Sequence, residues 1–130
     1  LGRLGLDAQA AAQAAQPPLA DDSGGPFQAK PHTADCSLTA DFNFDPASDE
    51  YRVITGDNGT APRLHDAWRL VHGDAPQPPT FHVHDSTYSP VPVACDFIFA
   101  SAGMSPRVRR VSVDSDTTVS DHQPVLLELA

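Results

Sequence analysis

The sequence predicts a single mixed α/β domain, and three observations carry that prediction. The chain has 130 residues, which is enough for one domain with a buried core. Apolar residues make up 40% of it and charged residues 19%, a balance typical of a globular protein. Short apolar runs typical of strands occur together with stretches of helical periodicity, and 13 prolines indicate many loops between short elements.

The amino-terminal part of the chain is predicted to contain a helix, a loop and the start of the first strand. Residues 1–16 are rich in Ala, Leu and Gln, with apolar side chains on one helical face, and prolines at 17 and 18 end that helix. Residues 17–35 lack periodicity and are predicted to form a loop. Residues 36–130 hold every motif that carries chemistry, and the first strand begins there with Cys36.

A helix is expected soon after the first strand. Asp45 is a suitable amino-terminal cap, because its side chain can accept from backbone N–H groups of the first turn, and Pro46 is tolerated in that turn. The helix should carry Tyr51, Val53 and Ile54 toward the core.

The remaining elements are predicted from apolar periodicity. A short helix is expected at 66–71, and strands are expected at 80–84, 94–100, 107–113 and 124–129. The run at 94–100 is almost continuously apolar, which indicates a strand that is buried on both faces.

Two residue pairs carry weaker signals. His82 and His84 would share one face of a strand and could bind a metal, but no third ligand lies nearby, so a solvated strand face is the favoured interpretation. Cys36 and Cys95 show neither Cys-x-x-Cys spacing nor a zinc pattern, and two free thiols are expected rather than a disulfide.

Charge restricts the class of partner. A formal net charge of −9 argues against a protein that holds nucleic acid on a broad basic surface, although bound cations could supply a local positive field for a phosphate ester. No apolar run approaches the roughly 18 residues of a membrane span, and no signal peptide opens the chain. We therefore expect no membrane span, and a cytoplasmic location is favoured.

Asp41 and Asn43 form the first pair of residues that carries chemistry. In an extended chain they would lie on the same side, while Phe42 and Phe44 turn into the core. A carboxylate oxygen can anchor a hard divalent cation, and an amide can donate to a phosphate oxygen. The alternative is a strand end with polar turn residues.

The second constellation combines Asp121 and His122 with the distant Asp96. Asp96 interrupts an apolar strand, so it needs a hydrogen-bonding partner or a place at the strand mouth. Histidine suits acid-base chemistry near neutral pH when a carboxylate fixes its tautomer, a task that Asp96 could perform. A surface Asp-His pair is the alternative. A serine-hydrolase triad with Ser120 is disfavoured because no nucleophile elbow surrounds that serine.

Three motifs in this order resemble the endonuclease/exonuclease/phosphatase family, which has the DNase I-like fold. They are Ala-Asp-Phe-Asn at 40–43, Cys-Asp-Phe-Ile-Phe-Ala-Ser at 95–101 and Ser-Asp-His-Gln-Pro-Val at 120–125. The resemblance implies a four-layer α/β/β/α sandwich with mostly antiparallel or mixed sheets and a site at one end of them. It also implies that residues 1–130 are the carboxy-terminal half of one domain, whose missing amino-terminal half supplies an Asn and the main metal-binding Glu.

The resemblance also assigns roles to individual residues. Asp41 would hold or activate water beside the metal, and Asn43 would bind the scissile phosphate. Asp96 would orient His122, which acts on the attacking water or steadies the charged phosphate and so contributes to substrate binding. Asp121, together with Asp41, would serve a Mg2+ or Mn2+ site.

The implied reaction is divalent-cation-dependent hydrolysis of a phosphate ester, of the phosphodiesterase or nuclease type, by in-line attack of water. The substrate would be nucleic acid, a phospholipid head group or a small phosphoester. The alternative is a catalytically incomplete binding module that keeps the fold and recognises a partner or a cation without turnover.

Overall fold

The first sheet has three antiparallel strands. The computed structural model describes residues 34–56, 63–87 and 90–130, so the helix expected at 1–16 and most of the loop at 17–35 lie outside the described residues. Strand β3 (Asp96–Ala100) lies in the centre, between β1 (Ser37–Asp41) and the two-residue strand β2 (His65–Asp66). The apolar run of β3 is therefore paired on both edges, as expected of a buried strand.

A β-hairpin forms the second sheet. Strand β4 (Val108–Val113) pairs antiparallel with β5 (Val125–Leu129), and a short 3-10 helix, η1 (Ser105–Arg107), precedes β4. The register shifts between Val108 and Arg110, which is the mark of a β-bulge near one end of the hairpin. Both strands were expected from sequence.

Two short helices complete the described fold. Helix α3 (Ala67–His72) begins after Asp66, whose Oδ1 accepts from Trp68 N at 2.8 Å, as expected for a helix at 66–71. Helix α2 (Asp49–Thr55) begins later than its sequence suggested, because Ser48 is its cap and accepts from Tyr51 N at 3.1 Å.

The predicted start and inner face of α2 both need correction. Asp45 closes a turn before the helix, with its Oδ1 accepting from Ala47 N at 2.7 Å. Tyr51 and Ile54 are buried as expected because they lie three residues apart on one helical face, whereas Val53 lies off that face and is 52% exposed.

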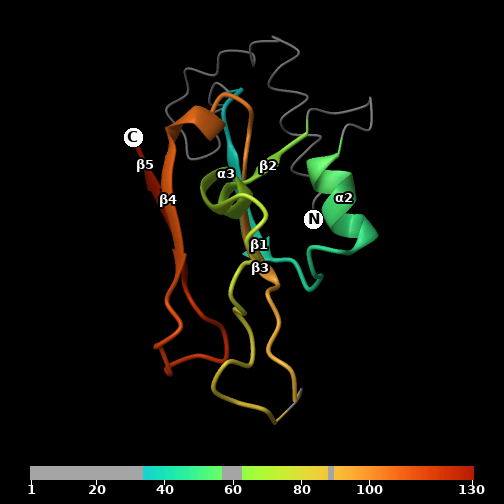
Figure 1. The fold of residues 1–130 in the computed structure, drawn as a ribbon, viewed down its shortest axis with the longest axis vertical. Helices are drawn as coiled ribbons and strands as arrows, with labels where there is room; N and C mark the ends of the chain where they lie inside the picture. The colour runs from blue at the N-terminus through green and yellow to red at the C-terminus, as the bar shows by residue number, and fades with distance from the viewer. Residues whose placement is uncertain (1–33, 57–62, 88–89) are drawn as a thin grey trace, which may run out of the picture.

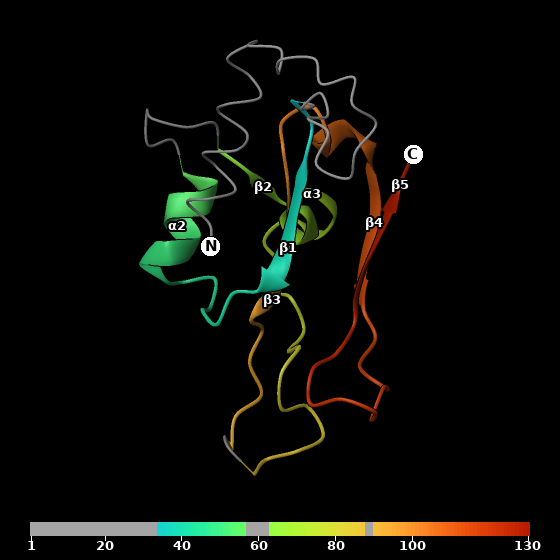
Figure 2. The same cartoon turned by 180° about the vertical axis from the view of Figure 1, so that it is seen from behind.

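The side chains of β3 divide the core into two clusters. Phe97 and Phe99 point to one face, where they pack with Tyr51 and Ile54 of α2. Ile98 points to the other face, where α3 and the β4–β5 hairpin contribute Trp68, Val111 and their neighbours. Figures 1 and 2 show this arrangement, with α3 against one face of the three-stranded sheet and the hairpin beside it.

The strand predicted at 80–84 is wrong. Only isolated bridges form there, between Phe81 and both Val93 and His122. The backbone at His82 has a φ of 57°, in the left-handed region, so the alternation of an extended strand breaks at this residue. His82 is consequently buried while His84 is exposed, and the two histidines share no face.

The described elements confirm a mixed α/β protein with antiparallel sheets. Neither helix of the described ranges is long and apolar enough to cross a membrane.

Candidate functional site

The predicted site residues meet at one end of the three-stranded sheet. Asp41 is the last residue of β1 and Asp96 the first of β3, and the antiparallel register pairs them directly. His122 lies on the loop that precedes β5, and the bridge between Phe81 and His122 ties that loop to the segment before β3. Figure 1 shows both loops extending past the same end of the sheet.

Asp96 and His122 are in direct contact. His122 Nδ1 lies 2.9 Å from Asp96 Oδ2, and the carboxylate side chain is only 19% exposed. An ionised carboxylate accepts hydrogen bonds only, so His122 Nδ1 carries the proton and donates it. Asp96 thus has the partner that its burial requires and lies at the strand mouth. The lone pair of the neutral imidazole is consequently on Nε2.

Thr80 holds this carboxylate from a second side. Its hydroxyl donates to Asp96 Oδ2 at 2.6 Å and accepts from the backbone N–H groups of Cys95 and Asp96, at 3.2 and 3.1 Å. Its carbonyl accepts from Gln123 N at 2.6 Å. Thr80 is fully buried, so this residue fixes the start of β3 and the His122 loop relative to each other.

The imidazole of His122 is held in place over Phe81. The two ring centroids lie 4.5 Å apart, and the backbone N–H of His122 donates to Ser120 Oγ at 3.1 Å. Nε2 faces Asp41, whose Oδ2 is 3.9 Å away. The side chains of His122 and Asp41 are 31% and 35% exposed, so both are accessible from solvent.

Acidic neighbours change the pKa of His122. Partial burial on its own would lower the pKa, but the hydrogen bond and charge of Asp96, with the charges of Asp41 and Asp121, outweigh that effect and raise the pKa above its ordinary value. The imidazole is therefore a better proton acceptor than a free histidine.

Asp41 and Asn43 are brought together by a turn rather than by the pleat of a strand. Strand β1 ends at Asp41, and Asn43 has a φ of 53°. Asp41 Oδ1 accepts from Asn43 N at 2.9 Å, which closes an Asx turn and leaves Oδ2 toward His122. Phe42 and Phe44 still pack against the core, as expected.

Asp121 lies on the loop before β5, next to His122 in sequence. It is exposed, and its Oδ1 is 3.4 Å from Ser120 Oγ. It lines a hollow of about 470 Å³ with residues 118–120, His84 and Asp85. The donors that gather with Asp41 within 4.8 Å, among the described residues, are Cys95 and His122. Asp121 acts on His122 through its charge.

Cys95 and Thr80 are site residues that sequence reasoning did not single out. Burial, followed by the charges of Asp96 and Asp41, raises the pKa of the Cys95 thiol to about 12, so it remains protonated at neutral pH and is no nucleophile. Both cysteines are free thiols, as expected. The position of Cys95 next to Asp96 was the one available signal, whereas nothing in the sequence marked Thr80.

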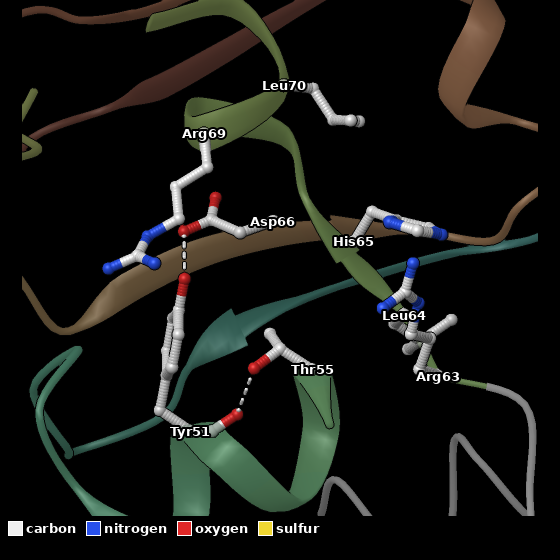
Figure 3. A pocket seen from close by; sticks show the side chains of 8 residues that line it. All are labelled: Tyr51, Thr55, Arg63, Leu64, His65, Asp66, Arg69 and Leu70. Atoms are coloured by element: carbon white, nitrogen blue, oxygen red, sulfur yellow. Dashed lines mark hydrogen bonds between the residues drawn. The ribbon is translucent and has the colours of Figure 1, made fainter. Parts of the chain in front are cut away.

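A second hollow, of about 300 Å³, lies between α2, β2 and α3 (Figure 3). Tyr51 Oη donates to Asp66 Oδ2 at 2.6 Å across it, and the guanidinium of Arg69 lies 5.5 Å from the Tyr51 ring centroid. Its lining includes none of the candidate site residues Asp41, Asp96, Asp121 and His122, so it is a separate feature of the surface.

No protein-family model matches the chain, and neither a curated protein nor a solved structure matches it.

The Asp96–His122 contact predicts a measurable change in titration. Replacing Asp96 with Asn should lower the pKa of His122, because the charge that stabilises the imidazolium is lost, and NMR of the imidazole resonances against pH measures this directly. Asp49→Asn is the matched control. The side chain of Asp49, in α2, is 91% exposed, so this change should leave the His122 titration unchanged.

The same contact links stability to pH. Because the pKa of His122 is raised in the folded state, the Asp96–His122 pair stabilises the folded protein fully at any pH below the unfolded-state pKa. This stabilisation is lost as the pH rises through the folded-state pKa.

The titration experiment has a contradicting outcome. An unchanged His122 titration in Asp96→Asn would show that the carboxylate does not govern the pKa of this imidazole.

Proposed function

We propose that this chain carries the catalytic part of a divalent-cation-dependent phosphoesterase, of the phosphodiesterase or nuclease type, as its resemblance to the endonuclease/exonuclease/phosphatase family implies. The observation that carries the proposal is the Asp96–His122 hydrogen bond, with Nε2 of His122 facing Asp41 at the solvent-accessible end of the sheet. A serine nucleophile is not part of it, because Ser120 Oγ accepts from the backbone of His122 and lies beside Asp121.

His122 is the general base in this proposal. Its neutral form accepts a proton at Nε2 from the water that attacks phosphorus, and the imidazolium that results is stabilised by Asp96 through Nδ1–H. The raised pKa favours this role, since it makes Nε2 a stronger proton acceptor than the imidazole of a free histidine. Asp96 is a positioning residue, because it acts through the imidazole.

A cation is needed because the site is acidic. Asp41, Asp96 and Asp121 all act on His122 through their charges, so a phosphate ester alone would be repelled. The accessible carboxylates of Asp41 and Asp121 are hard oxygen donors, and Mg2+ typically binds one or two carboxylates together with water and substrate phosphate. Bound Mg2+ or Mn2+ would neutralise charge on the phosphate oxygens and polarise the phosphorus centre.

Asn43 is the proposed phosphate-binding residue. Asn43 lies two residues after Asp41, with a left-handed backbone and an exposed side chain, so its amide is available to donate to a substrate oxygen. The proposal also includes a four-layer sandwich completed by an amino-terminal half with further metal ligands. Activity is therefore best assayed on the complete gene product.

Kinetics of a double-mutant cycle test the proposed pairing. His122→Ala should lower kcat by about a hundredfold to ten-thousandfold, the usual contribution of a general base, and Asp96→Asn should lower it through the same imidazole. The double variant should be little worse than His122→Ala alone, because residues acting as one unit are not additive. Initial rates on a panel of phosphodiesters and phosphomonoesters provide the measurement.

Two results would count against this proposal. If the losses in kcat of the two single variants multiply in the double variant, Asp96 does not act through His122. If the wild-type protein binds phosphoesters without hydrolysing them, the chain is a binding module.

Metal titration tests the cation. Hydrolysis should stop after treatment with EDTA and return with Mg2+ or Mn2+, since both are bound through oxygen. Asp121→Asn should raise the Mg2+ concentration needed for half-maximal activity, whereas Asp116→Asn, an exposed residue of the same loop, should not. Full activity after exhaustive EDTA treatment would remove the cation from the mechanism.

A further inference from the structure

Three metal-ligating atoms of different chemical type converge in the candidate site. A carboxylate oxygen of Asp41, Sγ of Cys95 and a ring nitrogen of His122 lie within 4.8 Å of one another. They come from three segments, namely the end of β1, the residue before β3 and the loop before β5. Cys95 is 5% exposed and forms the floor, while the two partly exposed side chains form the rim.

The orientation of His122 suits a ligand. Asp96 occupies Nδ1, so the nitrogen that remains for a metal is Nε2, and a carboxylate on the other ring nitrogen is the usual support of metal-binding histidines. Nε2 and Asp41 Oδ2 are 3.9 Å apart. Bonds from zinc to nitrogen and oxygen are about 2.0–2.2 Å, so two ligands at a tetrahedral angle lie about 3.4 Å apart, and a small approach of these two side chains would bring both onto one ion.

The donor set selects the class of cation. Carboxylate, imidazole and thiolate together suit a borderline-soft ion such as Zn2+ or Cd2+, whereas Mg2+ avoids sulfur. Sequence alone gave no sign of this set, because Asp41, Cys95 and His122 have no zinc-type spacing along the chain.

We propose that Asp41, Cys95 and His122 form a binding site for a thiophilic divalent cation of the zinc class, and that occupancy of this site inhibits hydrolysis. Binding forms a metal–sulfur bond and releases the thiol proton to solvent, so no oxidant or reductant is involved. Inhibition follows because the ion takes the Nε2 lone pair that the proposed general base needs. The inhibitory part rests on the proposed function, but the binding site does not.

Cadmium provides a direct probe, because a Cd2+–thiolate bond has its own ultraviolet charge-transfer absorption. Titration of the wild-type protein with Cd2+ should produce this absorption and saturate at one ion per chain. Cys95→Ser should abolish it, and Cys36→Ser is the matched control that should retain it, since Cys36 is the other free thiol. His122→Ala, which alters a partly exposed residue, should weaken Cd2+ binding by more than about tenfold, as should Asp96→Asn through its support of the imidazole.

Two outcomes would overturn the site: absorption that survives Cys95→Ser but disappears in Cys36→Ser, or Cd2+ affinity that His122→Ala leaves unchanged. The inhibitory part is tested separately, by Zn2+ inhibition of Mg2+-supported hydrolysis. The concentration for half-inhibition should rise at least about tenfold in Cys95→Ser relative to that variant's own uninhibited rate. Unchanged inhibition would overturn this part. Cd2+ binding in a protein without phosphoesterase activity would support the metal site and contradict the proposed function. Hydrolysis in a protein that does not bind Cd2+ would support the proposed function and contradict the metal site.

Discussion

The partly buried carboxylate of Asp96 is the constraint on which the rest of this site depends. It opens a strand that is otherwise apolar and almost completely buried, and an ionised group there is costly unless donors surround it. Thr80 and His122 supply those donors from two loops that are distant in sequence from β3. The hydrogen bonds that position the Asp96 carboxylate and the His122 imidazole therefore also hold the two loops to the sheet.

The sheet determines where this chemistry can occur. Antiparallel pairing of β1 with β3 places Asp41 beside Asp96, and the Asx turn at Asn43 then directs the second Asp41 oxygen toward the imidazole. The two aromatic residues of β3 anchor the same strand against α2, on the opposite face from Ile98. Packing of an ordinary apolar core thus positions two carboxylates and one histidine, those of Asp41, Asp96 and His122, at one solvent-accessible end of the sheet.

Much of this could be predicted from the chemistry of single residues. Asp96 stands in an apolar run, so its carboxylate was expected to need a hydrogen-bonding partner. His122 is that partner, although it lies 26 positions further along the chain. The alternation of apolar and polar residues gave a wrong prediction at 80–84, where tertiary contacts override the local backbone preference. His82 takes a left-handed conformation with its N–H donating to the carbonyl of Asp121 at 3.1 Å, which a period-two pattern does not reveal. The contribution of Thr80 depends on its burial beneath Asp96, and sequence does not report burial of a single threonine.

The chemistry proposed for this site requires Asp96 to fix the proton of His122 on Nδ1, so that a basic Nε2 faces the solvent-accessible end of the sheet. Nitrogen-15 NMR of the His122 ring, recorded above its pKa so that the imidazole is neutral, tests this claim most directly. We expect a protonated Nδ1 and an unprotonated Nε2 in the wild-type protein, with this preference lost in Asp96→Asn. A neutral ring protonated on Nε2, in the presence of an intact Asp96, would contradict it.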